Sequence, residues 1–269
     1  MMSSAKLISN QKITNPFKVE HLRGLLASES KFSELFSTYS LRYPEIKDQN
    51  MPKFWDGLNI NNDTLIEKNN PMLKERLKIV VNMIKEDNIN ILNVGFGSAN
   101  LEKNFFSQKK TFNWYGIDIS RFSVKSASKK YPRGNFEVGN ANSIKSKDNY
   151  FNYVVGLEVL EHIRPSLTFK ALGEMYRVLK RGGKLIISVP LNEQLEEMVS
   201  INKNPNAHVR VYSPSLIKAE LKIAGFKILR EKRLFAFHDF YKIKTFIAKY
   251  FLVWKFKPNN IIILAQKPL

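Results

Sequence analysis

The sequence predicts an α/β protein in which a doubly wound, mostly parallel sheet carries helices on both faces. Two observations carry this prediction: strand-like runs alternate with helical segments, and a glycine turn directly follows the first run. Repeated strand-then-helix order favours parallel strands, because each helix returns the chain to the same edge of the sheet. The five central runs are Ile89–Val94, Asn113–Ile117, Asn135–Val138, Tyr153–Leu157 and Lys184–Val189.

Further periodic segments surround these runs. Apolar spacing predicts a helix over Met72–Glu86, two helices between the central runs, and a helix, strand, basic aromatic helix and last strand after them. The helices between the central runs are Arg121–Lys130 and Leu167–Leu179. After the central runs come the helix Ser213–Ala224, the strand Phe226–Leu234, the basic aromatic helix Phe240–Trp254 and the last strand Asn260–Gln266.

The first 71 residues have a different pattern. Residues 16–37 carry apolar side chains at helical spacing, and a turn-rich stretch follows over residues 43–71. In that stretch, Phe54 and Trp55 are candidates for a lid over a ligand or for packing on the core. We divide the chain into an N-terminal helical extension and lid (1–71) and a core (72–269) with a basic aromatic helical insertion near 238–257.

Composition narrows the classes of function. The 269 residues include no cysteine, which excludes disulfides, thiolate metal sites and cysteine nucleophiles. The start lacks the apolar run of a signal peptide, and no stretch is long and apolar enough to span a bilayer, so we expect a cytoplasmic protein. The net charge of +19 favours nucleic acid, anionic lipid or anionic metabolites as partners, or reflects a basic surface in solvent.

The glycine turn is the first candidate binding element. Gly95 and Gly97 lie between a buried strand and a helix, where a nucleotide-like ligand approaches the backbone of a doubly wound sheet. Asp118 ends the next strand, where its carboxylate can accept hydrogen bonds from ribose hydroxyls. A nicotinamide dinucleotide would use similar geometry, but Asn100 stands at the sixth position, so the GxGxxG pattern is incomplete.

Taken in order, the motifs resemble those of class I S-adenosylmethionine-dependent methyltransferases, of the methyltransferase type 11 and ubiquinone-pathway O-methyltransferase kind. The resemblance runs from about Met72 to the end, through NVGFGSAN, GIDIS, VGNANSIKSKDNYFNYVVGLEVLEHI, EMYRVLKRGGKLIISVP and HVRVYSPSLIKAELKIAGF. It implies a Rossmann-like sheet of seven strands with an antiparallel last strand. It also implies S-adenosylmethionine as cofactor.

The resemblance assigns cofactor contacts to particular residues. Asp118 matches the ribose-binding position, Asn140 and Ala141 match the pair that contacts adenine, and Leu157 and Glu158 match the residues beside the methionine moiety. The complete set of expected cofactor contacts is Asn93, Gly95, Phe96, Gly97, Asp118, Ile119, Asn140, Ala141, Asn142, Leu157 and Glu158.

Three positions depart from the family pattern. The family often has aspartate where Asn93 and Asn140 stand, and glycine where Ala99 stands. An asparagine side chain still offers a carbonyl oxygen as a hydrogen-bond acceptor, and alanine adds one methyl group to glycine. We expect weaker contacts to the cofactor at these positions, not their loss.

Candidate catalytic residues follow the fourth central run in EVLEHI. If a helix begins there, Glu158, Glu161 and His162 lie on one face of it. His162 is the candidate general base, because an imidazole titrates near neutral pH, and Glu161 is its candidate partner. Alternatively, His162 is a helix-start histidine that bonds a loop carbonyl.

The same segment suggests a metal. It resembles the E-x-x-E-H motif of small-RNA terminal 2′-O-methyltransferases and ubiquinone-pathway O-methyltransferases, which with a later histidine can hold a divalent ion. Here the set would be Glu158, Glu161, His162 and His208. Two carboxylates and two imidazoles suit magnesium, manganese or zinc, which would acidify a substrate hydroxyl.

The acceptor is the least determined part of the function. We expect O-methylation of a small molecule or of a sugar in a glycan or lipid-linked precursor. The alternatives are an RNA methyltransferase of the terminal 2′-O type, which the absence of a separate RNA-binding module disfavours, and a non-catalytic cofactor-binding module. The insertion, with five lysines around apolar positions at helical spacing, fits peripheral contact with an anionic inner membrane face, or a helix that covers the sheet edge.

Overall fold

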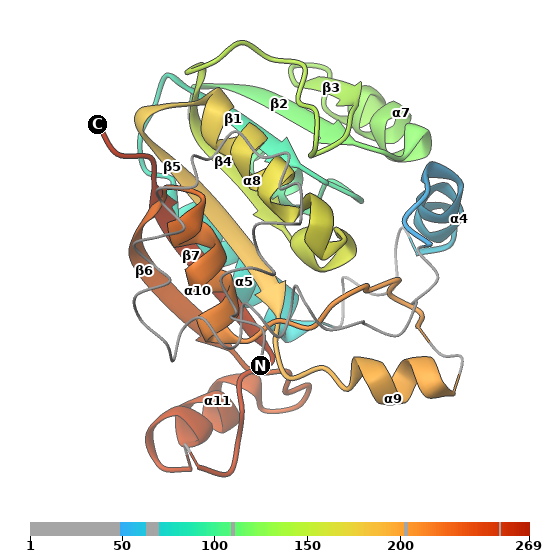
Figure 1. Ribbon diagram of the computed structural model, residues 1–269, viewed down its shortest axis with the longest axis vertical. Coiled ribbons are helices and arrows are strands. Elements are labelled where there is room, and N and C mark those ends of the chain that lie inside the picture. The colour runs from blue at the N-terminus through green and yellow to red at the C-terminus, as the bar shows by residue number, and fades with distance from the viewer. Residues whose placement is uncertain (1–48, 63–69, 109–110, 202–203, 253) are drawn as a thin grey trace, which may run out of the picture.

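One seven-stranded sheet, in the order β3-β2-β1-β4-β5-β7-β6, forms the centre of the molecule (Figure 1). In the computed structural model, residues 49–62, 70–108, 111–201, 204–252 and 254–269 are described. Neighbouring strands are parallel from β3 to β5, and β7 is antiparallel to both β5 and β6. The strands are β1 (Ile89–Val94), β2 (Phe112–Asp118), β3 (Asn135–Val138), β4 (Phe151–Leu157), β5 (Leu179–Pro190), β6 (Lys227–Leu234) and β7 (Asn260–Gln266). The predicted fold class is confirmed.

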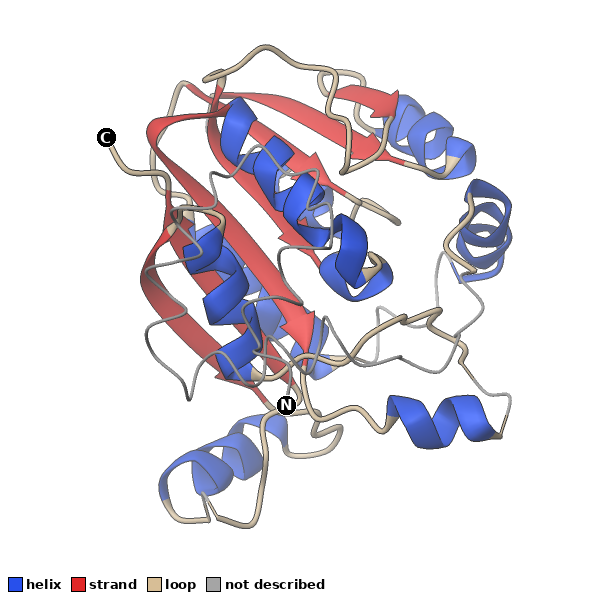
Figure 2. Ribbon diagram, viewed as in Figure 1, coloured by secondary structure: helices blue, strands red, loops and turns tan. Residues whose placement is uncertain are grey.

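Helices alternate with the strands and cover both faces of the sheet (Figure 2). Several begin at a cap that their sequence supplies: Asn70 accepts a hydrogen bond from the amide of Leu73, and Ser120 from that of Ser123. The helices are α4 (Pro52–Asn62), α5 (Pro71–Met83), α6 (Asn100–Phe106), α7 (Arg121–Lys130), the 3₁₀ helix η1 (Leu160–His162), α8 (Pro165–Val178), α9 (Leu195–Ser200), α10 (Pro214–Ile223) and α11 (Tyr241–Tyr250).

The core has two layers because successive side chains of a strand point to opposite faces. On the face covered by α8 and α10, Leu92 and Val154 pack with Leu172. On the opposite face, Ile91 and Trp114 pack with residues of α5 and α6. Both sets are buried, so β1 and β4 read as nearly continuous apolar runs, as strands covered on both faces do.

The strand order places a crevice at one edge of the sheet. β1 lies between β2 and β4 in the sheet. The connection after β1 leads to β2 and β3 on one side, and the connection after β3 returns across the sheet to β4 on the other side. In open α/β sheets, the loops at the carboxyl ends of such strands separate and leave room for a ligand. Here the loops after β1, β2 and β4 contain the glycine turn, Asp118 and the EVLEHI segment.

Two expectations about local structure were wrong. Residues 52–62 form a helix, α4, where the sequence predicted only turns. Its apolar pattern is weak, and it is held instead by a tertiary contact: Asp56 Oδ1 accepts hydrogen bonds from Ser120 Oγ (2.6 Å) and from the amide of Phe122 (3.0 Å). The basic aromatic helix, expected over Phe240–Trp254, is shorter and covers Tyr241–Tyr250. The helices expected over residues 16–37 lie outside the described residues.

Within the described residues, none of the helices has both the length and the apolar character needed to cross a bilayer.

Candidate functional site

The glycine turn after β1 adopts left-handed backbone conformations at three residues. Gly95, Gly97 and Ala99 have φ angles of +67°, +54° and +57°. At Gly95, a Cβ would lie 2.7 Å from Val159 Cγ2, whereas at Gly97 it would meet no atom within 4 Å. Gly95 is therefore required by both conformation and space, and Gly97 by conformation and by access to its backbone. Ala99 stands at a conformation that glycine adopts with less strain.

Asp118 joins the end of β2 to this turn. Its Oδ2 accepts a hydrogen bond from the amide of Gly97, and its Oδ1 accepts one from the amide of Ser120, both at 2.8 Å. Burial raises the pKa of Asp118 even though both amide bonds lower it. Each carboxylate oxygen has a second lone pair, so the side chain can hold the turn and still accept hydrogen bonds from a ligand.

A cavity of about 480 Å³ opens at this edge of the sheet, within the size range of about 300–1,000 Å³ usual for ligand pockets. All eleven expected cofactor contacts line it, from Asn93 to Glu158. The loop after β3 forms one wall, where Asn140 Oδ1 accepts a hydrogen bond from the amide of Asn142 (2.9 Å). His162 also lines the cavity, whereas Glu161 and His208 are not among the lining residues.

Glu158 and Arg76 form an ion pair on the wall of the cavity, with Arg76 Nη1 2.6 Å from Glu158 Oε2. Glu158 has a φ of +55°, and its oxygens also accept hydrogen bonds from Ser188 Oγ (2.7 Å) and Asn260 Nδ2 (2.9 and 3.0 Å). Burial alone would raise the pKa of Glu158, but the Arg76 guanidinium and these hydrogen bonds hold it below its usual range. Glu158 is therefore a carboxylate at neutral pH.

Glu158 does not share a helix face with the residues that follow it, contrary to the expectation. Its left-handed backbone precedes the 3₁₀ helix η1, which begins at Leu160 and contains only Glu161 and His162 of the three. The Glu158 carboxylate pairs with Arg76, and of the four expected metal ligands only Glu161, His162 and His208 form a group among the described residues.

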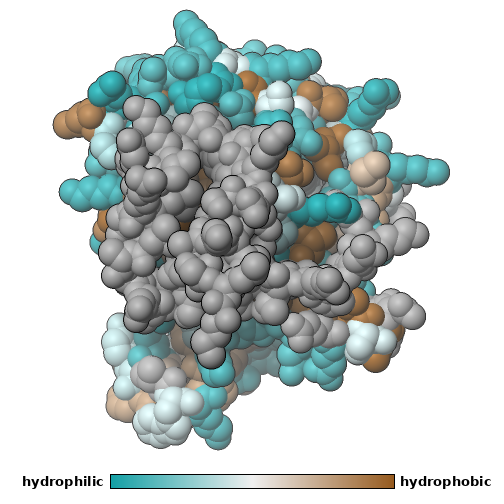
Figure 3. All heavy atoms as spheres, viewed as in Figure 1, coloured by the Kyte–Doolittle hydropathy of each residue, from teal (hydrophilic) through white to brown (hydrophobic). Residues whose placement is uncertain are grey.

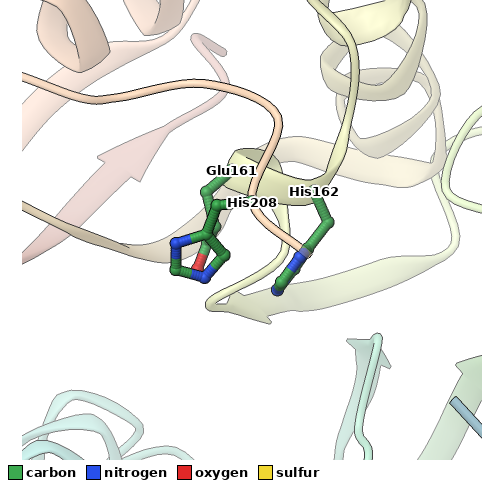
Figure 4. A group of neighbouring side chains, drawn as sticks. All are labelled: Glu161, His162 and His208. Atoms are coloured by element: carbon green, nitrogen blue, oxygen red, sulfur yellow. The ribbon is translucent and has the colours of Figure 1, made fainter. Parts of the chain in front are cut away.

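Glu161, His162 and His208 do lie together, with their ligand atoms within 4.8 Å of one another (Figure 4). Glu161 is fully buried, and neither of its carboxylate oxygens has a hydrogen-bond partner among the described residues. Burial, and after it the charge of Glu158, raises the pKa of Glu161 well above its usual range. His208 Nδ1 lies 2.8 Å from Glu193 Oε2, which orients the other ring nitrogen away from that carboxylate.

Helix α4 contributes to the wall of the cavity. Trp55 lines the cavity and packs edge-to-face on His162, with ring centroids 4.8 Å apart. Asn50 Nδ2 donates to the carbonyl of Ala207 (2.9 Å), and Asp56 binds the start of α7. The segment thus spans from the loop after β2 to the loop that carries His208. Of the two lid candidates, Trp55 is a lining residue.

Sequence reasoning missed Arg76 and Asn260. Arg76 lies between Leu73 and Leu77, two residues of the apolar face of α5 that also line the cavity, and a lone arginine beside such a face was the available signal. Asn260, at the start of β7, offered no signal, because its contact with Glu158 joins positions 102 residues apart.

Comparison with known proteins gives the family. Residues 68–231 match a family model described as a methyltransferase domain. An uncharacterized protein of Methanocaldococcus jannaschii is 29% identical over 163 residues, which cover 60% of this chain and 65% of that protein. The match thus spans somewhat less than two thirds of the relative's length.

Solved structures share the fold. A chain of the complex between the Haloferax volcanii Trm112 methyltransferase activator and a methyltransferase superposes with a TM-score of 0.63 and 15% identity, over 81% of this chain and 98% of that one. A SAM-dependent methyltransferase from Archaeoglobus fulgidus gives a TM-score of 0.57 and 19% identity, over 73% and 93%.

Proposed function

The chain belongs to the methyltransferase-domain family and is an S-adenosylmethionine-dependent methyltransferase, and from that premise we propose that its acceptor is a hydroxyl group. We place this hydroxyl on a small molecule or on a sugar of a glycan or lipid-linked precursor. The observation that carries the proposal is the position of the His162 imidazole, a candidate base on the wall of the cavity that the cofactor contacts line.

The lining of the cavity offers contacts to three parts of the cofactor: the ribose, the adenine and the methionine moiety. Asp118 would accept the ribose hydroxyls, Asn140, Ala141 and Asn142 would contact the adenine, and the Gly95–Gly97 turn would run beside the methionine moiety. Arg76 adds a site for the methionine carboxylate, because its buried Nε has no hydrogen-bond acceptor among the described residues. Glu158, ionised beside it, suits the amino group or the sulfonium.

Methyl transfer from a sulfonium is an in-line displacement, which needs alignment and a dry site more than covalent chemistry. S-adenosylmethionine supplies the methyl group as an electrophile. Trp55 packs on the His162 ring, and the contacts of Asp56 with Ser120 and of Asn50, just before α4, with Ala207 hold the segment that carries Trp55. His162 would then accept the proton of the acceptor hydroxyl as its oxygen attacks the methyl carbon.

Two measurements test this proposal. Calorimetry with S-adenosylhomocysteine should show binding that Asp118→Asn weakens about tenfold or more, since the amide cannot replace a charged acceptor. The matched control is Asp87→Asn, an exposed aspartate before β1 at the opposite edge of the sheet. Unchanged affinity in Asp118→Asn, with the fold intact by thermal melting, contradicts the cofactor placement.

The acceptor class is tested with methyl-labelled S-adenosylmethionine. Label is followed into the small-molecule, lipid, glycan and RNA fractions of a cell extract. The proposal predicts label in a small-molecule, glycan or lipid-linked product, lost on His162→Gln. Label in RNA identifies the alternative that the charge of +19 favours, a terminal 2′-O-methyltransferase. Binding without label in any fraction identifies a non-catalytic module.

A divalent cation at Glu161, His162 and His208 is a second proposal. The buried, unpartnered carboxylate of Glu161 is the supporting observation, together with Glu193, which contacts His208 as carboxylates contact metal-ligating histidines. Such an ion, of the magnesium, manganese or zinc kind, would acidify the acceptor hydroxyl, with His162 as its ligand and not as the base. Metal analysis of the purified protein tests it: bound ion lost in Glu161→Gln supports it, and full activity with no ion after chelation contradicts it.

A further inference from the structure

The segment between β6 and β7 projects from the carboxyl edge of the sheet, the edge that also holds the cavity (Figure 1). Its base is fixed to the body. The amide of Asn259 donates to the carbonyl of Leu234 (2.8 Å), and Asn192 Nδ2 donates to that of Pro258 (2.6 Å). Phe237 packs with Phe235 and Phe256, with ring centroids 5.8 and 5.5 Å away. The base of the projection is therefore packed and hydrogen-bonded as part of the fold.

Helix α11, within this projection, turns one face to the body. Tyr241, Thr245, Ala248 and Leu252 recur at helical spacing, and each is partly or fully buried, with Ala248 wholly so. These residues account for the way α11 is anchored. They leave the opposite side of the helix pointing outwards.

That outer side is apolar. Ile243, Phe246, Ile247 and Tyr250 lie at the i, i+3, i+4 and i+7 positions of the helix, and all four are exposed. Exposed aromatic side chains flank them; Phe240 is 74% exposed and Trp254 81%. Of the thirteen large hydrophobic side chains that are exposed in the described part of the chain, seven lie in residues 240–254. Such a patch marks an interaction surface.

Lysines border this apolar surface. On the helix, Lys242 and Lys249 lie on one flank and Lys244 on the other, and all are exposed. Lys255 and Lys257 follow beside Trp254 and are exposed as well. Asp239 is the one acidic residue in 238–257. Figure 3 shows tan, near-white and teal side chains together on this projection.

We propose that residues 240–252 and 254–257, which we name the α11 surface, bind an anionic membrane. The apolar row would enter the boundary between head groups and acyl chains, the aromatic rings would lie at head-group level, and the lysines would contact lipid phosphates. One side of the helix is buried, so its apolar row points outwards. The cavity opens at the same sheet edge, which suits an acceptor carried in or near the membrane.

A lipid surface fits these residues better than a second copy of the chain. Two copies meeting through this patch would oppose the same lysines, and like charges across an interface are unfavourable. An anionic bilayer instead supplies negative charge around the apolar row on every side. The proposal concerns binding alone and does not depend on methyl transfer or on the acceptor.

Vesicle sedimentation with the full chain tests the proposal. We expect binding to vesicles of phosphatidylcholine with phosphatidylglycerol and little binding to phosphatidylcholine alone. Lys242→Gln/Lys249→Gln should weaken binding about 25-fold, about fivefold for each lysine. The matched control is Lys125→Gln/Lys129→Gln, which removes two exposed lysines from α7. Equal loss in the control variant overturns the proposal, because binding would then follow net charge and not this surface.

The apolar row is tested separately. Phe246→Ser/Trp254→Ser replaces exposed side chains, so the fold should be unchanged, and vesicle binding should fall about tenfold or more. Tryptophan emission should shift to shorter wavelength on vesicle binding in the native chain but not in Trp254→Phe. Vesicle binding that survives Phe246→Ser/Trp254→Ser overturns the proposal. The proposal is also overturned if the native chain does not bind vesicles and Phe246→Ser/Trp254→Ser abolishes dimer formation or RNA binding. The surface would then belong to that partner.

Discussion

Replacing Gly95 with alanine should destabilise the protein far more than replacing Gly97. Both residues have left-handed backbone conformations, which cost an alanine about 1–2 kcal/mol. Only at Gly95 does the new methyl group meet a neighbour, at 2.7 Å from Val159 Cγ2, and forcing atoms into a packed site costs about 1–3 kcal/mol more. We expect Gly95→Ala to lose about 2–5 kcal/mol and Gly97→Ala about 1–2 kcal/mol.

Urea unfolding of a double-mutant cycle isolates the contact. Val159→Ala removes the atom that the new methyl group would strike, so the double variant should lose about 1–3 kcal/mol less than the sum of the single variants. The cost of the left-handed backbone at residue 95 remains in Gly95→Ala and in the double variant. Equal losses in Gly95→Ala and Gly97→Ala, or simple additivity with Val159→Ala, would refute this explanation of the turn.

The two variants should also differ in cofactor binding. A methyl group on Gly97 has open space because the residue lines the cavity, so it occupies room that the ligand needs. We expect Gly97→Ala to weaken binding of S-adenosylhomocysteine about tenfold or more while remaining folded, a loss equivalent to about 1.4 kcal/mol. Binding of native strength in Gly97→Ala would show that the ligand does not approach this backbone.

Three further predictions concern the surroundings of the cavity. Glu102, a buried residue of α6, accepts hydrogen bonds from Asn93 Nδ2 (2.8 Å) and Trp114 Nε1 (2.9 Å). Burial raises the pKa of Glu102 from 4.5 to about 7, so the folded state holds its proton more tightly. The resulting stability is full below pH 4.5 and lost as the pH rises to about 7. The stability of Glu102→Gln relative to the native chain should therefore rise by about 3 kcal/mol over that interval, and a difference independent of pH would contradict this. Ala99→Gly should raise the unfolding free energy by about 1 kcal/mol in urea, because it relieves a φ of +57°; a loss of stability would mean that the buried methyl group matters more. Asp56→Ala removes the acceptor of Ser120 and Phe122, so amides of α4 should exchange with deuterium about tenfold faster, and unchanged exchange would show that α4 is held elsewhere.

The sequence predicted the sheet well because its strands carry strong local signals. The boundaries of Asn135–Val138, Asn260–Gln266 and the helix Arg121–Lys130 agree with the structure. In each case, polar or turn-forming residues end a pattern whose period matches the element. The positions of the glycine turn and of Asp118 were predicted as well, since each follows directly from the end of one strand, and the two are joined by a hydrogen bond.

Two of the errors have a common cause, which is that the stabilising contacts join distant parts of the chain. Helix α4 is fixed by the Asp56 contact with Ser120, 64 residues away, and Glu158 turns to Arg76, 82 residues before it. The exposed aromatic row of α11 has a helical pattern that a core helix also shows, so periodicity alone left its direction open.

The central claim is that the cavity beside the glycine turn holds S-adenosylmethionine, and a crystal structure of the chain with S-adenosylhomocysteine tests it most directly. The account predicts the ribose at Asp118, the adenine beside Asn140 and Ala141, and the methionine carboxylate at Arg76. A cavity without ligand, or a ligand bound at another place on the chain, would contradict it.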